Sequence, residues 1–302
     1  MYLNTHKDKD KMEKDIIIFL PHRDFALSIL IPKKIMKYFT ALLCLYIAAP
    51  LSALAQDFTA MTYNIRYDTE HDGINRWEAR KAWVTELFAD QKPDIFGVQE
   101  ALHHQVVFLD SALSRYRYVG VGRDDGNQKG EYTAVFVDSS RFRILYSETF
   151  WLSPTPDRIS IGWDASMERI CTLVKLEDMQ NEKKLWVFNA HLDHRGQESR
   201  LNALKLIRER ANKSSDPGDA ILIMGDFNAR PDAAPIVYLS AYFDDAFLIA
   251  ENRADGPVGT YHGFDPEHPL DGRIDYIFSK NLKPLFYRNI HLQKGDRFPD
   301  RK

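Results

Sequence analysis

The chain has 302 residues, of which 44% are hydrophobic and 12% aromatic, so it is long and apolar enough to bury a sizeable core. Its 40 basic and 43 acidic residues give a net charge of −3, and no basic stripe is visible. Because phosphate contacts dominate binding to long polyanions, this balance argues against a dedicated DNA- or RNA-binding groove.

The first 55 residues have the pattern of a processing segment rather than of a folded domain. Residues 37–55 combine a basic start, an apolar stretch and an Ala-Leu-Ala ending, as secretory signal peptides do. Met36 directly precedes them, so we interpret 36–55 as the signal peptide and 1–35 as an over-called N-terminal extension. The alternative, a membrane anchor, is disfavoured because the apolar stretch is short and Pro50 interrupts it.

Cleavage would leave residues 56–302, which contain no linker, repeat or low-complexity block and are therefore predicted to form one domain. The removed segment holds 8 basic and 5 acidic residues, so the mature net charge would be −6. Cys171 would be the one cysteine left, which excludes an intramolecular disulfide. We expect a secreted or periplasmic monomer, with no stable membrane anchor after cleavage.

Hydrophobic periodicity predicts many strands and three long helices. Strands are predicted, in chain order, at 58–65, 93–100, 116–122, 132–138, 142–152, 169–178, 184–193, 219–226, 273–280 and 283–292. Helices are predicted at 77–91, 104–113 and 197–212. Long helices flanking strands in each half suit two packed sheets with helices on both outer faces.

Polar side chains stand at the ends of several of these apolar strands. They are Asn64, Glu100, His191, Asp226 followed by Asn228, and Asp275 within the run RIDYIF. Each alone has an ordinary explanation as a turn, a cap or a core residue. Together they favour a divalent-metal phosphoesterase, since buried acids and imidazoles are costly unless they are paired or bind a metal.

The ordered motifs TYNIR, QE, GEY, NAHLDH, GDFN and RIDYIF resemble the endonuclease/exonuclease/phosphatase superfamily, which has the DNase I-like fold. The resemblance covers almost all of residues 56–302, and the run VGRDDGNQKGEYTAVF is similar to an exported bacterial subgroup. It implies an α/β fold: a four-layer α-β-β-α sandwich of two packed mixed sheets.

The resemblance also implies roles for the strand-end residues. Glu100 would bind Mg²⁺, with Asn64 beside it as a second metal-site residue, and Mn²⁺ or Ca²⁺ are alternatives. Asp226 would orient or deprotonate the attacking water, and Asn228 would hold the phosphate.

Further resemblance-implied positions lie at the phosphate and around it. His191 would contact the scissile phosphate and Glu131 would orient it, although a surface turn acid is an equal reading of Glu131. Independently of the resemblance, the bidentate donors of arginine suggest a phosphate pocket lined by Trp77, Arg80, Arg123, Trp163 and Arg169, with ordinary packing and surface ion pairing as the alternative for each. His194 is interpreted as loop structure or a substrate contact.

The motif order departs from the superfamily pattern after the last strand. A Ser-Asp-His segment normally follows there, and its histidine pairs with the aspartate that corresponds to Asp275. This chain ends KGDRFPDRK, with no histidine after His291. We expect a severely impaired enzyme if the chain is complete, because loss of a general acid or electrostatic partner commonly costs about 10²–10⁴-fold in rate. We interpret the domain as truncated at its C-terminus, by a frameshift or as a fragment, and loss of catalysis in the lineage is the alternative.

The sequence therefore predicts an exported Mg²⁺-dependent phosphoesterase that attacks a phosphodiester or phosphate ester in line with water. Two alternatives stay open: a catalytically inactive binding protein on the same fold, and a secreted nuclease. An adhesin-like sandwich ranks last, since it leaves the acid and amide strand ends unexplained.

Overall fold

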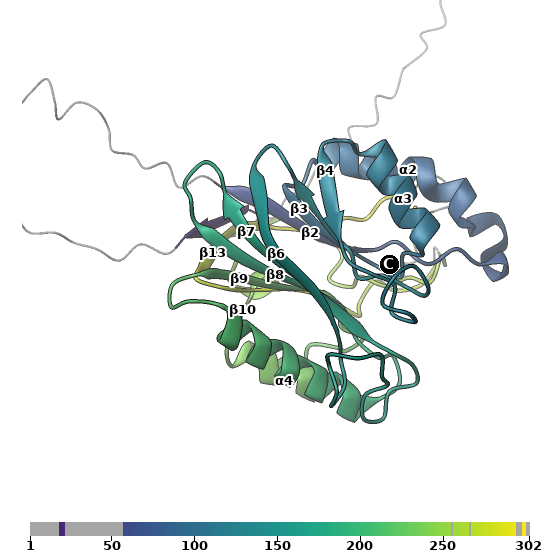
Figure 1. Cartoon of the computed structure of the whole chain (residues 1–302). Coiled ribbons are helices and arrows are strands. Elements are labelled where there is room, and N and C mark those ends of the chain that lie inside the picture. Colours follow the sequence, from purple (N-terminus) through teal and green to yellow (C-terminus); the bar gives the residue numbers. More distant parts are fainter. Residues whose placement is uncertain (1–17, 22–56, 255, 266, 294–297, 300–302) are drawn as a thin grey trace, which may run out of the picture.

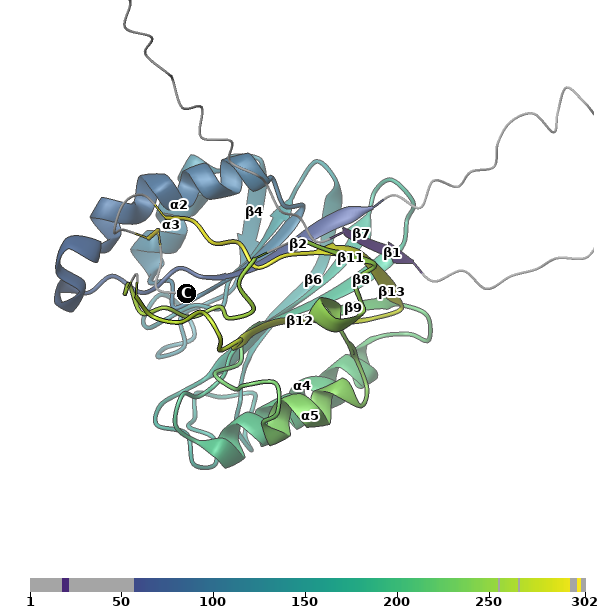
Figure 2. The ribbon, with the colours of Figure 1, turned by 180° about the vertical axis from the view of Figure 1, so that it is seen from behind.

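Two β-sheets pack face to face between two layers of helices (Figures 1 and 2). The computed structural model describes residues 18–21, 57–254, 256–265, 267–293 and 298–299. Helices α2 (Trp77–Gln91) and α3 (His103–Ala112) cover the outer face of one sheet. Helices α4 (Gln197–Ser214) and α5 (Ala234–Ser240) cover the other. The predicted four-layer sandwich is confirmed.

The first sheet has seven strands and is mixed. In spatial order it contains β11 (Asn252–Arg253), β13 (Leu282–Tyr287), β1 (Ile18–Pro21), β2 (Phe58–Asn64), β3 (Ile95–Gln99), β5 (Val135–Asp138) and β4 (Tyr116–Val119). The β2/β3 and β11/β13 pairs are parallel, and the other pairs are antiparallel.

The second sheet has six strands. Its order is β10 (Asp244–Asp245), β12 (Asp275–Lys280), β9 (Ala220–Asp226), β8 (Lys184–His191), β7 (Ile170–Asp178) and β6 (Phe142–Trp151). Only β8 and β9 run parallel among these pairs, with α4 as their crossover. The short helices η1 (Glu70–Asn75) and α6 (Ala246–Ile249) complete the described elements.

The hydrophobic core has three parts, one at each boundary between layers. The middle part, between the sheets, includes Val135, Val187, Leu222 and Ile277. The outer parts lie under α2 and α3 on one side and under α4 and α5 on the other. Burial on both faces explains why the strands are near-continuous apolar runs in the sequence.

Helix α2 shows how closely the sequence pattern defines an element. Its bounds match the predicted 77–91, and it stops where Lys92 adopts a left-handed conformation (φ 47°) just before Pro93. Its buried face contains Trp77, Arg80, Val84, Leu87, Phe88 and Gln91. Trp83, which was predicted on this face, is half-buried.

The N-terminal predictions fall largely outside the described residues. The predicted signal peptide, 36–55, lies outside them altogether. Strand β1 comes from the predicted extension 1–35 and lies between β13 and β2. Within the described part of the chain, no helix has the length and apolar character needed to cross a membrane.

Candidate active site

The strand ends that carry polar residues meet at one edge of the sandwich. In the first sheet, Asn64 pairs with Gln99, so Glu100 follows directly beside it. In the second sheet, Asp226 lies between His191 on β8 and Asp275 on β12. The polar strand ends within each sheet are therefore neighbours in the structure.

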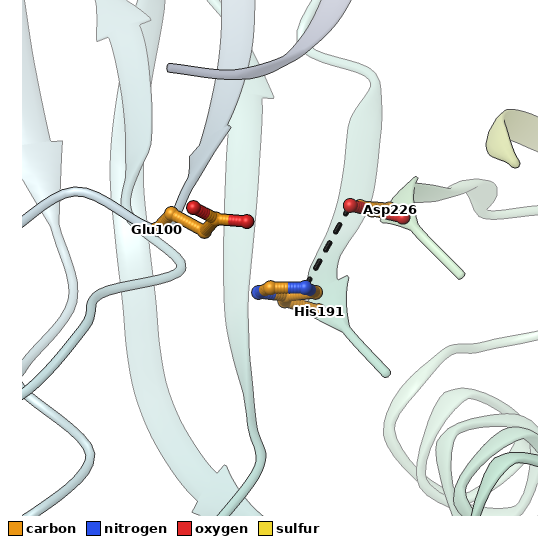
Figure 3. A group of neighbouring side chains, drawn as sticks. All are labelled: Glu100, His191 and Asp226. Carbon is orange, nitrogen blue, oxygen red and sulfur yellow. Dashed lines mark ion pairs between the residues drawn. The ribbon is translucent and has the colours of Figure 1, made fainter. Parts of the chain in front are cut away.

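Three of these residues form a compact cluster. Ligand atoms of Glu100, His191 and Asp226 all lie within 4.8 Å of one another, and the three residues are buried. Glu100 comes from the first sheet and the other two from the second, and their side chains point toward one another (Figure 3). His191 Nε2 lies 3.6 Å from Asp226 Oδ2.

Asn64 links the two carboxylates of this cluster. Its Nδ2 donates to Glu100 Oε1 and to Asp226 Oδ2, both at 2.9 Å. Its Oδ1 accepts the backbone N–H of Arg66 at 3.0 Å. In this arrangement Asn64 orients the carboxylates through its N–H groups, and its predicted role as a metal ligand stays a prediction.

Arg66 and its neighbour Tyr67 complete the donors around Glu100. Glu100 Oε2 lies 3.3 Å from both Arg66 Nη1 and the backbone nitrogen of Tyr67. Burial would lower the pKa of Arg66, but its hydrogen bonds to Asp72 and the charge of Glu100 raise it overall. Sequence reasoning missed Arg66, although its position in TYNIR, two residues after Asn64, was an available signal.

A buried amide pair joins the two sheets just behind the cluster. Gln99 Nε2 donates to Asn189 Oδ1 at 2.6 Å, and Asn189 Nδ2 donates to the carbonyl oxygens of Val98 and Ala134. Gln99 directly precedes Glu100, while Asn189 lies two residues before His191. The pair therefore fixes the strand that carries Glu100 relative to the strand that carries His191.

The backbone at the site is unusual in its conformation. Glu100 (φ 62°) and Asn228 (φ 46°) are left-handed, a conformation that is uncommon for residues other than glycine. Gly225 (φ 141°) lies inside β9, and a Cβ there would approach the Ala190 oxygen to 1.9 Å. Gly225 is thus required by close approach to β8, and the chain turns after β9, with Asn228 in the turn.

His191 is surrounded by groups that fix its ring. Its Nδ1 lies 3.2 Å from Arg169 Nη1 and 3.5 Å from Glu131 Oε2, and its Nε2 lies 3.1 Å from Asn228 Nδ2. Burial would raise the pKa of Glu131, but the hydrogen bond to His191 and the charge of Arg123 outweigh it and lower that pKa to about 2. Glu131 is therefore an ionised partner of His191 at neutral pH.

A tight hairpin positions Glu131 together with Arg123. The backbone N–H of Arg123 donates to the backbone carbonyl oxygen of Glu131, and the Asp125 carboxylate accepts the backbone N–H groups of Asn127 and Lys129 within the turn. Across this hairpin the guanidinium of Arg123 donates to both carboxylate oxygens of Glu131 at 2.9 Å. Glu131 is therefore half-buried against Arg123, and its predicted catalytic role stays a prediction.

Arg169 lies behind two imidazole rings. Its Nη1 faces His191, its Nη2 lies 2.9 Å from His194 Nδ1, and its Nε donates to Asp193 Oδ2 at 3.3 Å. Asp193 also accepts from Ser166 and from two backbone N–H groups of its own loop. Burial would raise the pKa of Asp193, but these hydrogen bonds and the charge of Arg169 lower it well below its usual range.

A cavity of about 620 Å³ opens beside this cluster. Its lining residues are Arg66, Tyr67, Glu100, Arg123, Glu131, Met167, Arg169, His191, His194, Asn228, Tyr261 and Ile274. The predicted substrate-binding residues Arg123, Arg169 and His194 are among them. Tyr67, Met167 and Tyr261 were missed, because each lies in a loop or turn with no periodic or motif signal. Ile274 was missed although it belongs to the motif RIDYIF.

Three other pocket candidates lie elsewhere. Trp163 is not part of this lining; it is half-exposed in the loop before Arg169. Trp77 and Arg80 are buried in α2, where Arg80 donates to the carbonyl oxygens of Ile65 and Pro299. Trp77 and Arg80 therefore serve packing rather than phosphate binding.

Asp275 lies beside Asp226 but faces a second, smaller cavity of about 100 Å³ that is also lined by Asn64 and His291. Its Oδ2 accepts a hydrogen bond from Thr260 Oγ1 at 2.6 Å. The predicted catalytic role of Asp275, and the predicted effect of the missing histidine, stay predictions.

The Glu100, His191 and Asp226 cluster fits a divalent cation by its donor chemistry. Two carboxylates from opposite sheets are buried within reach of one another, an arrangement that is costly without a neutralising charge. Carboxylate oxygens suit Mg²⁺, and an imidazole nitrogen is also a ligand for transition metals. Glu100 and Asp226 would hold such an ion, with His191 beside them.

Together the fold and the site define a class of protein. The chain belongs to the Endonuclease/Exonuclease/phosphatase family, which it matches over residues 61–291.

Among solved structures, it resembles an endonuclease/exonuclease/phosphatase from Bacteroides vulgatus at 35% identity, covering 72% of this chain and 85% of that one, with a TM-score of 0.69. The mannosyl-6-phosphatase of Bacteroides thetaiotaomicron is 32% identical, with 74% and 85% covered and a TM-score of 0.70. An uncharacterised protein of Acanthamoeba polyphaga mimivirus is 29% identical over 171 residues, which cover 54% of this chain and 63% of that relative.

Proposed function

We propose that this protein is an exported, Mg²⁺-dependent phosphoesterase that hydrolyses a phosphate ester by in-line attack of water. The observation that carries the proposal is the cluster of Glu100, His191 and Asp226 beside a cavity that is also lined by Arg123 and Arg169. The similarity to a mannosyl-6-phosphatase supports a phosphatase within this family.

The side chains of the site match the tasks of such a reaction. A divalent ion at Glu100 and Asp226 would supply charge neutralisation for the phosphate oxygens. Asp226 orients and deprotonates the attacking water. His191, beside Glu131, and Asn228, beside His191, would contact the phosphate oxygens, where negative charge develops.

The size of the cavity favours a small substrate. Its volume of about 620 Å³ lies within the ~300–1,000 Å³ range of small-molecule sites. Mn²⁺ or Ca²⁺ remain alternatives to Mg²⁺ as the cofactor, since carboxylate oxygens bind all three. Export rests on the sequence pattern of residues 36–55 alone.

Hydrolysis of p-nitrophenyl phosphate and of bis-p-nitrophenyl phosphate tests the proposal. Activity should require Mg²⁺, disappear in EDTA, and fall at least about 10²-fold in Asp226→Ala. The matched control is Asp232→Ala, an exposed aspartate of the following turn, which should keep wild-type activity. A folded protein inactive on both esters with every metal would favour a binding protein, and activity that survives EDTA would exclude the metal-dependent mechanism.

A further inference from the structure

His194 has an environment that the hydrolysis of phosphate does not explain. It lines the same cavity as His191, yet it does not belong to the cluster of Glu100, His191 and Asp226. It is solvent-exposed, whereas Arg169, which contacts it, is buried. The buried guanidinium of Arg169 therefore orients the exposed imidazole of His194.

The contact with Arg169 sets the hydrogen-bonding character of the His194 ring. A guanidinium has only donors, so His194 Nδ1, at 2.9 Å from Arg169 Nη2, must accept. The ring proton of the neutral imidazole then lies on Nε2. Burial and the positive charge of Arg169 lower the pKa of His194, which keeps this ring neutral near pH 7.

Arg169 itself cannot readily turn away. Its Nε donates to the buried Asp193, and its Nη1 faces His191 Nδ1 at 3.2 Å. Asp193 is held in turn by Ser166 and by the N–H groups of Arg195 and Gly196. His194 therefore presents a fixed, uncharged N–H donor to the cavity.

An uncharged donor is suited to a hydroxyl group rather than to the phosphate. Charge for the phosphate would come from an ion at the carboxylates, and Arg123 lines the same cavity. The same cavity also presents the rings of Tyr67 and Tyr261, and rings with polar edges suit sugar faces and hydroxyls.

We propose that His194, held by Arg169, is the group that recognises a hydroxyl of a phosphorylated sugar bound in this cavity. This proposal rests on the phosphoesterase function proposed above. It adds the class of substrate, a phosphorylated sugar, and the residue that recognises the sugar, His194.

The first test compares two substrates in wild type and His194→Ala: mannose 6-phosphate, which has hydroxyls, and p-nitrophenyl phosphate, which has none. The ratio of their kcat/KM values should fall about 10-fold in His194→Ala, the size of one hydrogen bond. His194→Gln, whose amide can replace the Nε2–H donor, should restore the ratio to within about 3-fold. His71→Ala removes an exposed histidine outside the cavity and should leave the ratio unchanged.

An equal loss on both substrates, or an unchanged ratio, would overturn the proposal and leave His194 a structural loop residue. A wild type that hydrolyses neither substrate would instead contradict the phosphoesterase function. Calorimetric binding then decides the subsite: mannose 6-phosphate should bind more tightly than inorganic phosphate in wild type, and His194→Ala should remove that preference. No preference in wild type would also overturn it.

NMR spectroscopy determines directly which nitrogen of the His194 ring carries the proton, and it does not depend on enzymatic activity. In ¹⁵N-histidine-labelled protein at pH 7.5, His194 should carry its proton on Nε2, and Arg169→Met should relax this tautomer preference. A wild-type ring protonated at Nδ1 would contradict the proposal, since Nδ1 could then not accept from Arg169.

Discussion

Asn64 shows how much of the site depends on single atoms. One amide nitrogen donates to the carboxylates of Glu100 and Asp226, which come from different sheets. The N–H groups reduce the repulsion between the two carboxylates and fix which oxygens face a cation. Groups that orient metal ligands in this way commonly matter nearly as much as the ligands.

We therefore expect Asn64→Ala to weaken Mg²⁺ activation about 10–100-fold. The Mg²⁺ concentration that gives half-maximal hydrolysis of p-nitrophenyl phosphate measures this. Asn212→Ala, at an exposed position of α4, is the matched control. An unchanged Mg²⁺ requirement in Asn64→Ala would show that the carboxylates are positioned without this amide.

Asp193 gives a pH-dependent prediction. Because its pKa is lowered in the folded protein, its contribution to stability is fully present above the ordinary pKa of an aspartate and is lost as pH falls through the folded value. Asp193→Asn should cost about 2 kcal/mol at pH 7, as hydrogen bonds to a charged group are removed. Urea unfolding measures the free energy of unfolding of wild type and of Asp193→Asn, and the difference between the two proteins should be smaller at pH 3 than at pH 7. The same difference at both pH values would mean that the charge of Asp193 does not contribute to stability.

The distance between the site residues of the two sheets depends on how closely β3 and β8 approach each other. Gly97 on β3 faces Asn189 on β8, and a Cβ at Gly97 would lie 2.6 Å from Asn189 Cγ. A glycine is thus needed here for space, because the Gln99–Asn189 amide pair occupies the gap between the sheets. The separation of the strands that carry Glu100 and His191 follows from this contact.

Gly97→Ala should destabilise the fold by about 1–3 kcal/mol through overpacking. In an Asn189→Ala background the same change should cost less, because the clashing amide is gone. A double-mutant cycle of urea unfolding measures the coupling. Purely additive effects would indicate that the sheets are not held apart by this contact.

The sequence predicted the elements better than it predicted the contacts between them. Helix α2 and the polar strand ends followed from periodicity and from motif order. The contact of Arg169 with His194, by contrast, joins the residue just before β7 to the loop after β8 through side-chain geometry that has no periodic signature. Tyr261 reaches the cavity from a long irregular loop for the same reason.

At the scale of the whole molecule, β1 connects the proposed export to the stability of the fold. A mature chain that starts at Gln56, whether translated from Met1 or from Met36, would lack β1, which pairs with β13 and β2 in the first sheet. We expect a chain that starts at Gln56 to melt about 5 °C below the full chain, the effect of losing a short strand. Phe19→Pro in the full chain should lower the melting temperature in the same direction, because proline cannot donate to the ladder.

Mass spectrometry of the exported protein tests the predicted cleavage site, and we expect Gln56 to be its first residue. A protein that keeps residues 18–21 after export would contradict the assigned signal peptide. Equal melting temperatures of the two chains would show that β1 adds nothing to the sheet.

The proposed mechanism requires a divalent cation held by Glu100 and Asp226, with His191 beside them. Anomalous X-ray scattering from crystals soaked in Mn²⁺, used in place of Mg²⁺, tests it most directly. We predict one strong manganese peak within coordination distance of the Glu100 and Asp226 carboxylates, and its loss in Glu100→Gln. A peak elsewhere, or none in a protein that is active with Mn²⁺, would contradict the proposed metal centre.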